Sequence, residues 1–155
     1  MKKVTLTTEK ILTAFNVLKG ASYQKMGDDD KIKLWKIARA MKPIATKFED
    51  DSKDAAEKLK PEGLDEQLEK AKEYEAKKQK GDTDLPMTEA EYLAFINGDW
   101  AKFNKLLAMA VKEFADAEVE LEFDALSEDA FAKLMASNDW KVDQVMTVAD
   151  LIITV

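Results

Sequence analysis

Residues 118–123 read Glu-Val-Glu-Leu-Glu-Phe, and this stretch decides how the chain closes into a fold. Apolar and acidic residues alternate with period two, so one face of a β-strand carries three apolar side chains and the other three carboxylates. A shorter alternation, Val4-Thr5-Leu6, lies near the other end of the chain. Each strand has one apolar face, which predicts a two-stranded antiparallel sheet that joins the two ends of the fold.

Helical spacing follows the first strand. The run Thr7-Thr8-Glu9 is typical of a helix N-terminus, and the apolar residues after it predict a helix over residues 8–19. The acidic triplet at 28–30 precedes a longer apolar stripe from Ile32 to Phe48, which predicts the strongest helix of the chain. Pro43 lies inside this stripe and predicts a kink near Met41.

Beyond Phe48 the chain becomes strongly charged. Residues 49–80 are mostly Lys, Glu, Asp and Ala, and Pro61-Glu62-Gly63 indicates a turn between two helices. A loop over residues 81–86 follows. We therefore expect residues 49–86 to form a protruding charged helical arm with a thin apolar seam, made of Ala55, Leu59, Leu64, Leu68, Ala71 and Tyr74.

Three further helices are expected after the arm. Thr88 caps a core helix with a break near residues 97–99, and Ser127 caps a short helix through Met135. Another helix begins at residues 138–140, and residues 151–155 form a final strand or a helical tail. The sequence thus predicts a single α+β domain over residues 1–155 that is mainly α. It combines a long helical hairpin or three-helix arrangement with a small two-stranded antiparallel sheet and the charged arm.

The composition excludes many chemistries. The chain has no histidine, no cysteine and one arginine, Arg39. It therefore lacks the side chains that most enzymes use for proton transfer near neutral pH and for covalent attack, and we expect no enzyme, no cofactor and no metal. The net charge of −7, with lysines interspersed among acids, argues against nucleic acid as a partner. No apolar run is long enough to span a membrane, and no signal peptide is expected.

Carboxylates are the remaining candidates for chemistry. The triplet Asp28-Asp29-Asp30 favours helix capping over a hard-cation site, because no distal ligand completes it. Carboxylates two residues apart on a strand are roughly 6.5 to 7 Å apart, a separation found in inverting glycosidases. Glu118, Glu120 and Glu122 of the predicted strand have this spacing. A solvated face or a docking face for a basic partner explains them better than the active site of a carboxylate-dependent hydrolase, since the sequence indicates no cleft. No sequence pattern pairs any of the four serines with a lysine that could act as its catalytic base.

Tryptophans are the most plausible specific contacts, because this residue is enriched at binding hot spots. We expect Trp35 to be buried, since it lies between Leu34 and Ile37, whereas Trp140 follows a polar turn. The candidate protein-binding residues come from the glutamate face of the predicted strand, from Trp140 and from the seam of the arm. They are Glu118, Glu120, Glu122, Trp140, Leu64, Leu68 and Tyr74.

Three segments of the chain share a recognisable pattern: residues 33–39 (Lys-Leu-Trp-Lys-Ile-Ala-Arg), the charged continuation of that helix, and residues 114–121 (Phe-Ala-Asp-Ala-Glu-Val-Glu-Leu). Together they resemble a small bacteriophage and prophage protein family of unknown function. The resemblance implies a phage or prophage origin and a layout of long helices with a late strand, and it brings no catalytic motif.

These observations favour a non-enzymatic protein that binds another protein, as a modulator of a host factor. The alternative is a minor virion or assembly component that forms homo-oligomers, and the least favoured hypothesis is the carboxylate-dependent hydrolase. We expect the protein in the cytoplasm of a bacterial host cell, with the virion as the alternative location.

Overall fold

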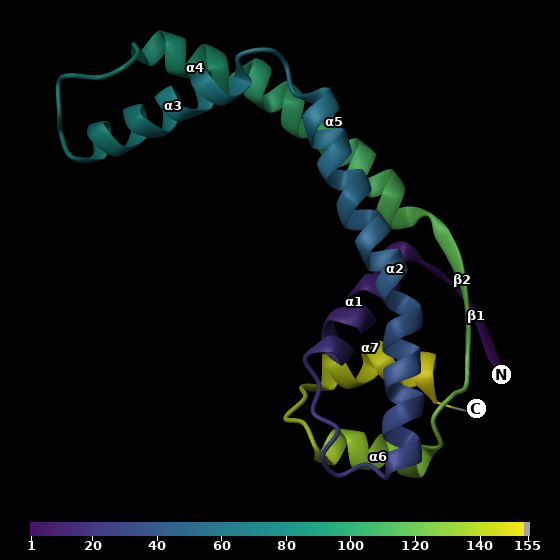
Figure 1. Ribbon diagram of the computed structural model, residues 1–155. Helices are drawn as coiled ribbons and strands as arrows, with labels where there is room; N and C mark the ends of the chain where they lie inside the picture. The colour runs from purple at the N-terminus through teal and green to yellow at the C-terminus, as the bar shows by residue number, and fades with distance from the viewer. Residues whose placement is uncertain (154–155) are drawn as a thin grey trace. The chain divides into compact units, whose positions relative to one another are not determined.

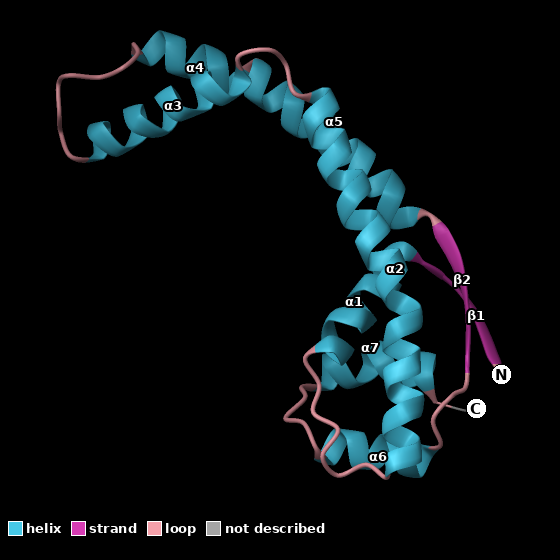
Figure 2. Cartoon of the chain, viewed as in Figure 1, coloured by secondary structure: helices cyan, strands magenta, loops and turns pink. Residues whose placement is uncertain are grey.

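The computed structural model describes residues 1–153 and confirms a mainly helical α+β fold (Figure 1). Within these residues, seven helices and one two-stranded sheet are present, as Figure 2 shows by colour. In chain order the elements are β1 (Lys2–Thr7), α1 (Thr8–Lys19), α2 (Asp28–Leu59), α3 (Leu64–Gln79), α4 (Glu89–Asn97), α5 (Asp99–Asp116), β2 (Glu118–Phe123), α6 (Glu128–Ala136) and α7 (Val142–Ile152). None of the helices in residues 1–153 is long and apolar enough to cross a membrane.

The chain divides into two compact units. The first consists of residues 1–51 and the residues from 113 onward, and the second consists of residues 52–112. The charged arm predicted over residues 49–86 falls largely within the second unit, together with α4 and most of α5. The grouping of all residues into a single domain stays a prediction.

The predicted sheet is confirmed with its register. β1 and β2 pair antiparallel, so that Val4 lies opposite Leu121 and Leu6 opposite Val119. These apolar side chains face the core of the first unit, and the intervening glutamates are exposed. The alternation of residues 118–123 therefore fixes both the strand and the face that it buries.

α1 begins and ends at the predicted residues. The Thr7 hydroxyl accepts a hydrogen bond from the backbone N–H of Lys10 at 3.4 Å, and Thr8 donates its hydroxyl hydrogen to the Ala117 carbonyl at 2.8 Å. One face of α1 is buried and packs against α7. The core of the first unit consists of Ile11, Ala14, Leu18, Met26, Leu34, Ile37, Met41, Leu121, Phe123, Leu126, Ala130, Phe131, Leu134, Val148, Leu151 and Ile152.

α2 continues through Pro43, and the predicted kink stays a prediction. Within the first unit, α2 buries Leu34, Ile37 and Met41. The prediction that Trp35 is buried was wrong, because this side chain is 51% exposed. Two residues along a helix turn by about 200°, so Trp35 and Ile37 point to nearly opposite sides, and proximity in sequence to buried residues does not imply burial.

The second unit has a thin core. The turn at residues 61–63 is confirmed, and Gly63 adopts a φ of 79°, a left-handed conformation that favours glycine. The break at residues 97–99 is also confirmed, since α4 ends at Asn97 and α5 begins at Asp99. The buried members of the apolar cluster in this unit are Leu64, Ala71, Phe95 and Phe103.

The two C-terminal helices, α6 and α7, begin in different ways. Ser127 accepts a hydrogen bond from the Ala130 N–H and caps α6 as predicted. α7 starts later than predicted, at Val142, because residues 137 and 138 bond to the loop after α1 instead of opening the helix. Ile153 then pairs with Leu126 in a single parallel bridge. Residues 154 and 155 of the predicted strand or tail lie outside the described residues.

Candidate functional site

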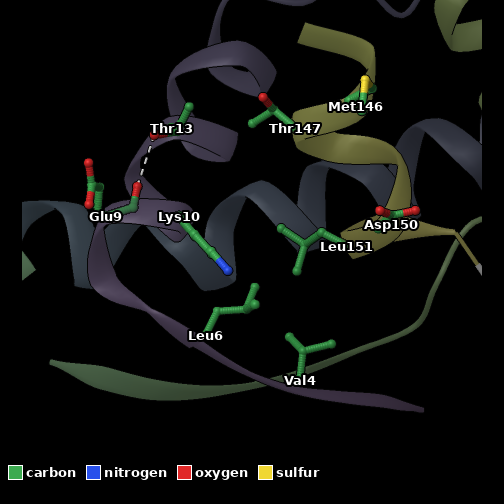
Figure 3. Close-up of a pocket in the computed structure, with 9 residues that line it drawn as sticks. All are labelled: Val4, Leu6, Glu9, Lys10, Thr13, Met146, Thr147, Asp150 and Leu151. Atoms are coloured by element: carbon green, nitrogen blue, oxygen red, sulfur yellow. Dashed lines mark hydrogen bonds between the residues drawn. The ribbon is translucent and has the colours of Figure 1, made fainter. Parts of the chain in front are cut away.

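A groove of about 680 Å³ lies between β1, α1 and α7 in the first unit (Figure 3). Its apolar surface comes from Val4 and Leu6 of β1 and from Met146 and Leu151 of α7. The period-two alternation of β1 turns Val4 and Leu6 to the same face, toward the helices. Both side chains remain partly exposed, so the helices do not cover this part of the sheet completely.

Polar side chains stand around the apolar surface of the groove. Glu9, Lys10 and Thr13 come from α1, and Thr147 and Asp150 come from α7. Figure 3 shows the Lys10 side chain extending from α1 into the space above Leu6. This combination of an apolar floor and a few polar groups suits binding, because apolar contact supplies affinity and polar groups orient the ligand.

The end of α7 beside the groove is fixed by Lys2. Its ammonium group donates hydrogen bonds to the carbonyl oxygens of Asp150 at 2.8 Å and Ile153 at 2.9 Å. The last carbonyls of a helix have no partner within the helix and attract cations. Lys2 thus ties the start of β1 to the end of α7 and holds the two walls of the groove together.

Two exposed apolar side chains of α7 adjoin this groove. Val142 is 75% exposed and Met146 is 69% exposed, and residues four apart lie on the same helix face. The methionine also lines the groove. Methionine adapts its shape readily and is used at binding surfaces that fit several partners. The groove therefore continues onto an uncovered apolar face of α7.

The glutamate face predicted from β2 is exposed. Glu118, Glu120 and Glu122 all point away from the core, and Glu120 forms an ion pair with Lys3 at 2.7 Å. Both partners of this pair are more than half exposed, so water screens the interaction. No described pocket is lined by these carboxylates.

The arm residues predicted to contact a partner are instead part of the second unit's own packing. Leu64 and Tyr74 are each 2% exposed, and Leu68 is partly buried against the same cluster. The seam residues Leu64, Ala71 and Tyr74 are buried on α3, which packs against α4, and the other seam residues are partly buried. Neither Leu64 nor Tyr74 offers a surface to another protein.

Trp140 is only partly buried and packs against the core of the first unit. It precedes α7, whose first residue is Val142. The indole therefore contributes to the packing of this unit while it keeps some exposed surface.

The other sequence candidates have local structural roles. The acidic triplet at 28–30 occupies the first turn of α2, where negative charge is favourable to the helix dipole. Ser127 caps α6, and the Ser137 hydroxyl accepts a hydrogen bond from the Lys25 N–H. Within residues 1–153, no group of three acidic, histidine or cysteine side chains has the arrangement of a metal site.

Sequence reasoning missed the groove. The alternation of Val4 and Leu6 predicted which face of β1 is apolar, but the uncovered part of that face depends on where α7 packs. No family model, no curated protein and no solved structure matches this chain.

Proposed function

We propose that this protein acts by binding another protein, and that the groove between β1, α1 and α7 receives an apolar segment of the partner. The observation that supports the proposal is the groove itself, with partly exposed Val4 and Leu6 as its floor and Met146 at its rim. When a partner covers exposed apolar surface and removes it from water, the free energy of binding becomes more favourable by roughly 25 cal/mol per Å².

A protein segment fits this surface better than a small molecule. Val142 and Met146 extend the apolar surface along α7, beyond the hollow that a small ligand would fill. A segment that lies in the groove and continues over these two side chains would cover both. Contact over such an area is typical of peptide recognition by a preformed groove.

The proposal contains no catalytic step. The titratable side chains around the groove are Glu9, Lys10 and Asp150, and the chain contains neither histidine nor cysteine to act beside them. The resemblance of residues 33–39 and 114–121 to a phage and prophage family extends the proposal to a host protein as the partner.

A role in assembly is the second candidate, and α5 supplies its support. Leu106 is 39% exposed and Met109 is 61% exposed, and residues three apart share one face of a helix. Self-association through this face would remove both side chains from water. Light scattering over a range of protein concentrations tests this candidate, and a monomer at every concentration would contradict it.

The groove is tested with a photo-crosslinking amino acid at position 146, in extract of the host cell. We expect this position to give a covalent adduct with one protein, and the same amino acid at position 109 to give none with it. Met146→Glu would place a charge at the groove and weaken binding of the captured protein by about tenfold or more. Met109→Glu is the matched control, since both methionines are exposed to a similar degree. Equal binding by the two glutamate variants would refute the groove as the site.

A further inference from the structure

Residues 31–48 of this acidic protein form a strongly basic stretch without any acidic residue. Residues 31–48 carry six cationic side chains, which are Lys31, Lys33, Lys36, Arg39, Lys42 and Lys47. Since the whole chain has a net charge of −7 and this stretch has +6, the remaining residues together carry −13. The stretch therefore concentrates positive charge within an acidic chain, and the only arginine of the chain belongs to it.

The structure places four of these six cationic side chains on one outer face of α2. The helix buries Leu34, Ile37 and Met41 in the first unit, and the opposite side is exposed. Successive residues on that side extend along about 22 Å of the helix, at 1.5 Å per residue. We call this surface the basic face of α2, made of Ile32, Trp35, Lys36, Arg39, Lys42 and Lys47.

Two apolar side chains lie among these cations. Ile32 is 52% exposed and Trp35 is 51% exposed, although both are of types that folding normally buries. The Arg39 guanidinium lies over the Trp35 ring, 5.1 Å from its centroid. This cation–π contact holds two side chains in place on the surface. Tryptophan and arginine are the residue types that most often dominate binding energy at protein interfaces.

A shallow hollow of about 600 Å³ continues the basic face toward its C-terminal end. Arg39, Lys42 and Lys47 line it together with Pro43, which presents no backbone N–H. Asp50 and Asp51 also line it at its C-terminal end, and Asp51 forms an ion pair with Lys47 at 2.9 Å. Acidic residues thus border the basic face at residues 28–30 and 49–51 and do not interrupt it.

We infer that the basic face of α2 docks an acidic amphipathic segment of a partner protein. Carboxylates of the segment would pair with Lys36, Arg39 and Lys42, and an apolar side chain would pack on Trp35 and Ile32. Arginine accepts a carboxylate in a bidentate geometry and keeps its charge at every relevant pH. The basic face shares no residue with the groove, so this inference is independent of the proposed function.

An acidic protein fits this surface better than a nucleic acid or a membrane. A duplex presents a long array of phosphates, and the −13 on the rest of the chain would repel it, whereas a short acidic segment meets the cationic face alone. Ile32 and Trp35 gain nothing from phosphates. A membrane-bound helix inserts a continuous apolar face, but the apolar face of α2 is already buried in the first unit.

The test uses a fluorescent synthetic peptide with glutamate and leucine at helical spacing, and the full-length protein. We expect binding that weakens with added salt, since exposed charges are screened within about 8 Å at physiological ionic strength. The matched peptide has glutamine at every glutamate position and should bind about tenfold more weakly. Failure of the acidic peptide to bind, or equal binding of the two peptides, would overturn the inference.

Paired variants locate the site on the protein. Arg39→Glu/Lys42→Glu should lower the affinity for the acidic peptide by about tenfold or more, because two attractions become repulsions. Lys102→Glu/Lys105→Glu changes the net charge equally on exposed residues of α5 and should change the affinity less than twofold or so. Equal losses in the two variants would show a general charge effect and overturn the inference. Tighter binding of duplex DNA or of phosphatidylserine vesicles than of the peptide would overturn the assignment to an acidic protein.

Discussion

The two units of the chain are stabilised in different ways. Among residues 1–153, the buried cluster of the first unit has sixteen side chains, contributed by α1, α2, α6, α7, β2 and the connections between them. The corresponding cluster of the second unit has four. Buried apolar area is the main favourable contribution to folding, so the first unit should carry most of the stability of the chain.

Aromatic contacts compensate in part for the smaller core of the second unit. Tyr74 and Tyr92 stack with ring centroids 4.5 Å apart, and Trp100 lies 6.2 Å from both Phe95 and Phe103. Such aromatic pairs contribute about 0.5–1.5 kcal/mol each beyond the area that they bury. Exposed ion pairs such as Lys58 with Asp54 add little. The comparison shows that a helical hairpin with a thin core depends on a few aromatic contacts.

Of the variants that test this difference between the units, Leu34→Ala should cause the largest loss of stability. Leu34 is fully buried in the first unit, and truncation would remove apolar contacts and leave a cavity. We expect a loss of about 3–5 kcal/mol in the free energy of unfolding, measured by urea denaturation. Ile32→Ala, two residues earlier and on the exposed face, is the control and should cost less than about 1 kcal/mol. Similar losses in both variants would refute the assignment of the buried face of α2.

Phe103→Ala should have a smaller and more local effect. Phe103 is 8% exposed and belongs to the four-residue cluster, so water can reach part of the space that truncation leaves. We expect a loss of about 2 kcal/mol that raises amide hydrogen exchange in α3 and α4. Leu106→Ala on the exposed face of α5 should leave exchange unchanged. An equal rise in exchange in α1 and α6 would show that the two units unfold as one.

Asn138→Ala should weaken the first unit by about 1–2 kcal/mol. The side-chain oxygen Oδ1 of Asn138 accepts a hydrogen bond from the Ser22 N–H at 2.7 Å. The side-chain nitrogen Nδ2 donates to the backbone carbonyls of Ser22 and Leu134, each at 2.9 Å. Alanine would remove this partner from the Ser22 N–H and carbonyl, whereas the Leu134 carbonyl keeps its bond from the Ser137 N–H at 3.1 Å. Asn104→Ala, at an exposed position of α5, is the control and should be near neutral in thermal unfolding. A near-neutral Asn138→Ala would show that water replaces all three bonds.

Local patterns predicted much of this fold. The alternation of residues 118–123 gave both the bounds of β2 and its buried face, and Thr7 gave the start of α1. These features are readable because a strand repeats every two residues and a cap acts within three. The turn at residues 61–63 and the break near Gly98 follow from proline and glycine in the same way.

Features that depend on packing between distant segments were not predictable. Trp35 has apolar neighbours in sequence, but its exposure is set by which side of α2 meets the core. The groove exists because α7 leaves part of Val4 and Leu6 uncovered, and no local pattern encodes that position. The arm's seam was predicted as apolar, yet its burial against α4 was not, since amphipathicity alone does not identify the partner of a face.

Tyr92→Phe should have the smallest effect on stability, and this effect should be measurable only at alkaline pH. The Tyr92 hydroxyl donates a hydrogen bond to the Glu75 carboxylate, and this bond, burial and the nearby negative charge raise the pKa of Tyr92 above its usual 10.0. The pKa of Lys78 is also raised, chiefly by its hydrogen bond to Tyr74. A raised pKa in the folded state stabilises the fold fully below the unfolded pKa, and this contribution is lost as the pH rises through the folded pKa.

The second unit should therefore lose stability as the pH rises above about 10, the unfolded pKa of tyrosine. Phenylalanine keeps the stacking with Tyr74 and removes the titrating hydroxyl, so Tyr92→Phe should flatten this alkaline loss while changing stability little at neutral pH. Hydrogen exchange in α3 and α4 against pH is the measurement. Tyr23 in the first unit, whose pKa is raised by burial, provides the matched control, because Tyr23→Phe should leave the profile of α3 and α4 unchanged. If Tyr23→Phe flattened that profile as much as Tyr92→Phe does, the two units would share one alkaline transition and the contrast between them would fail.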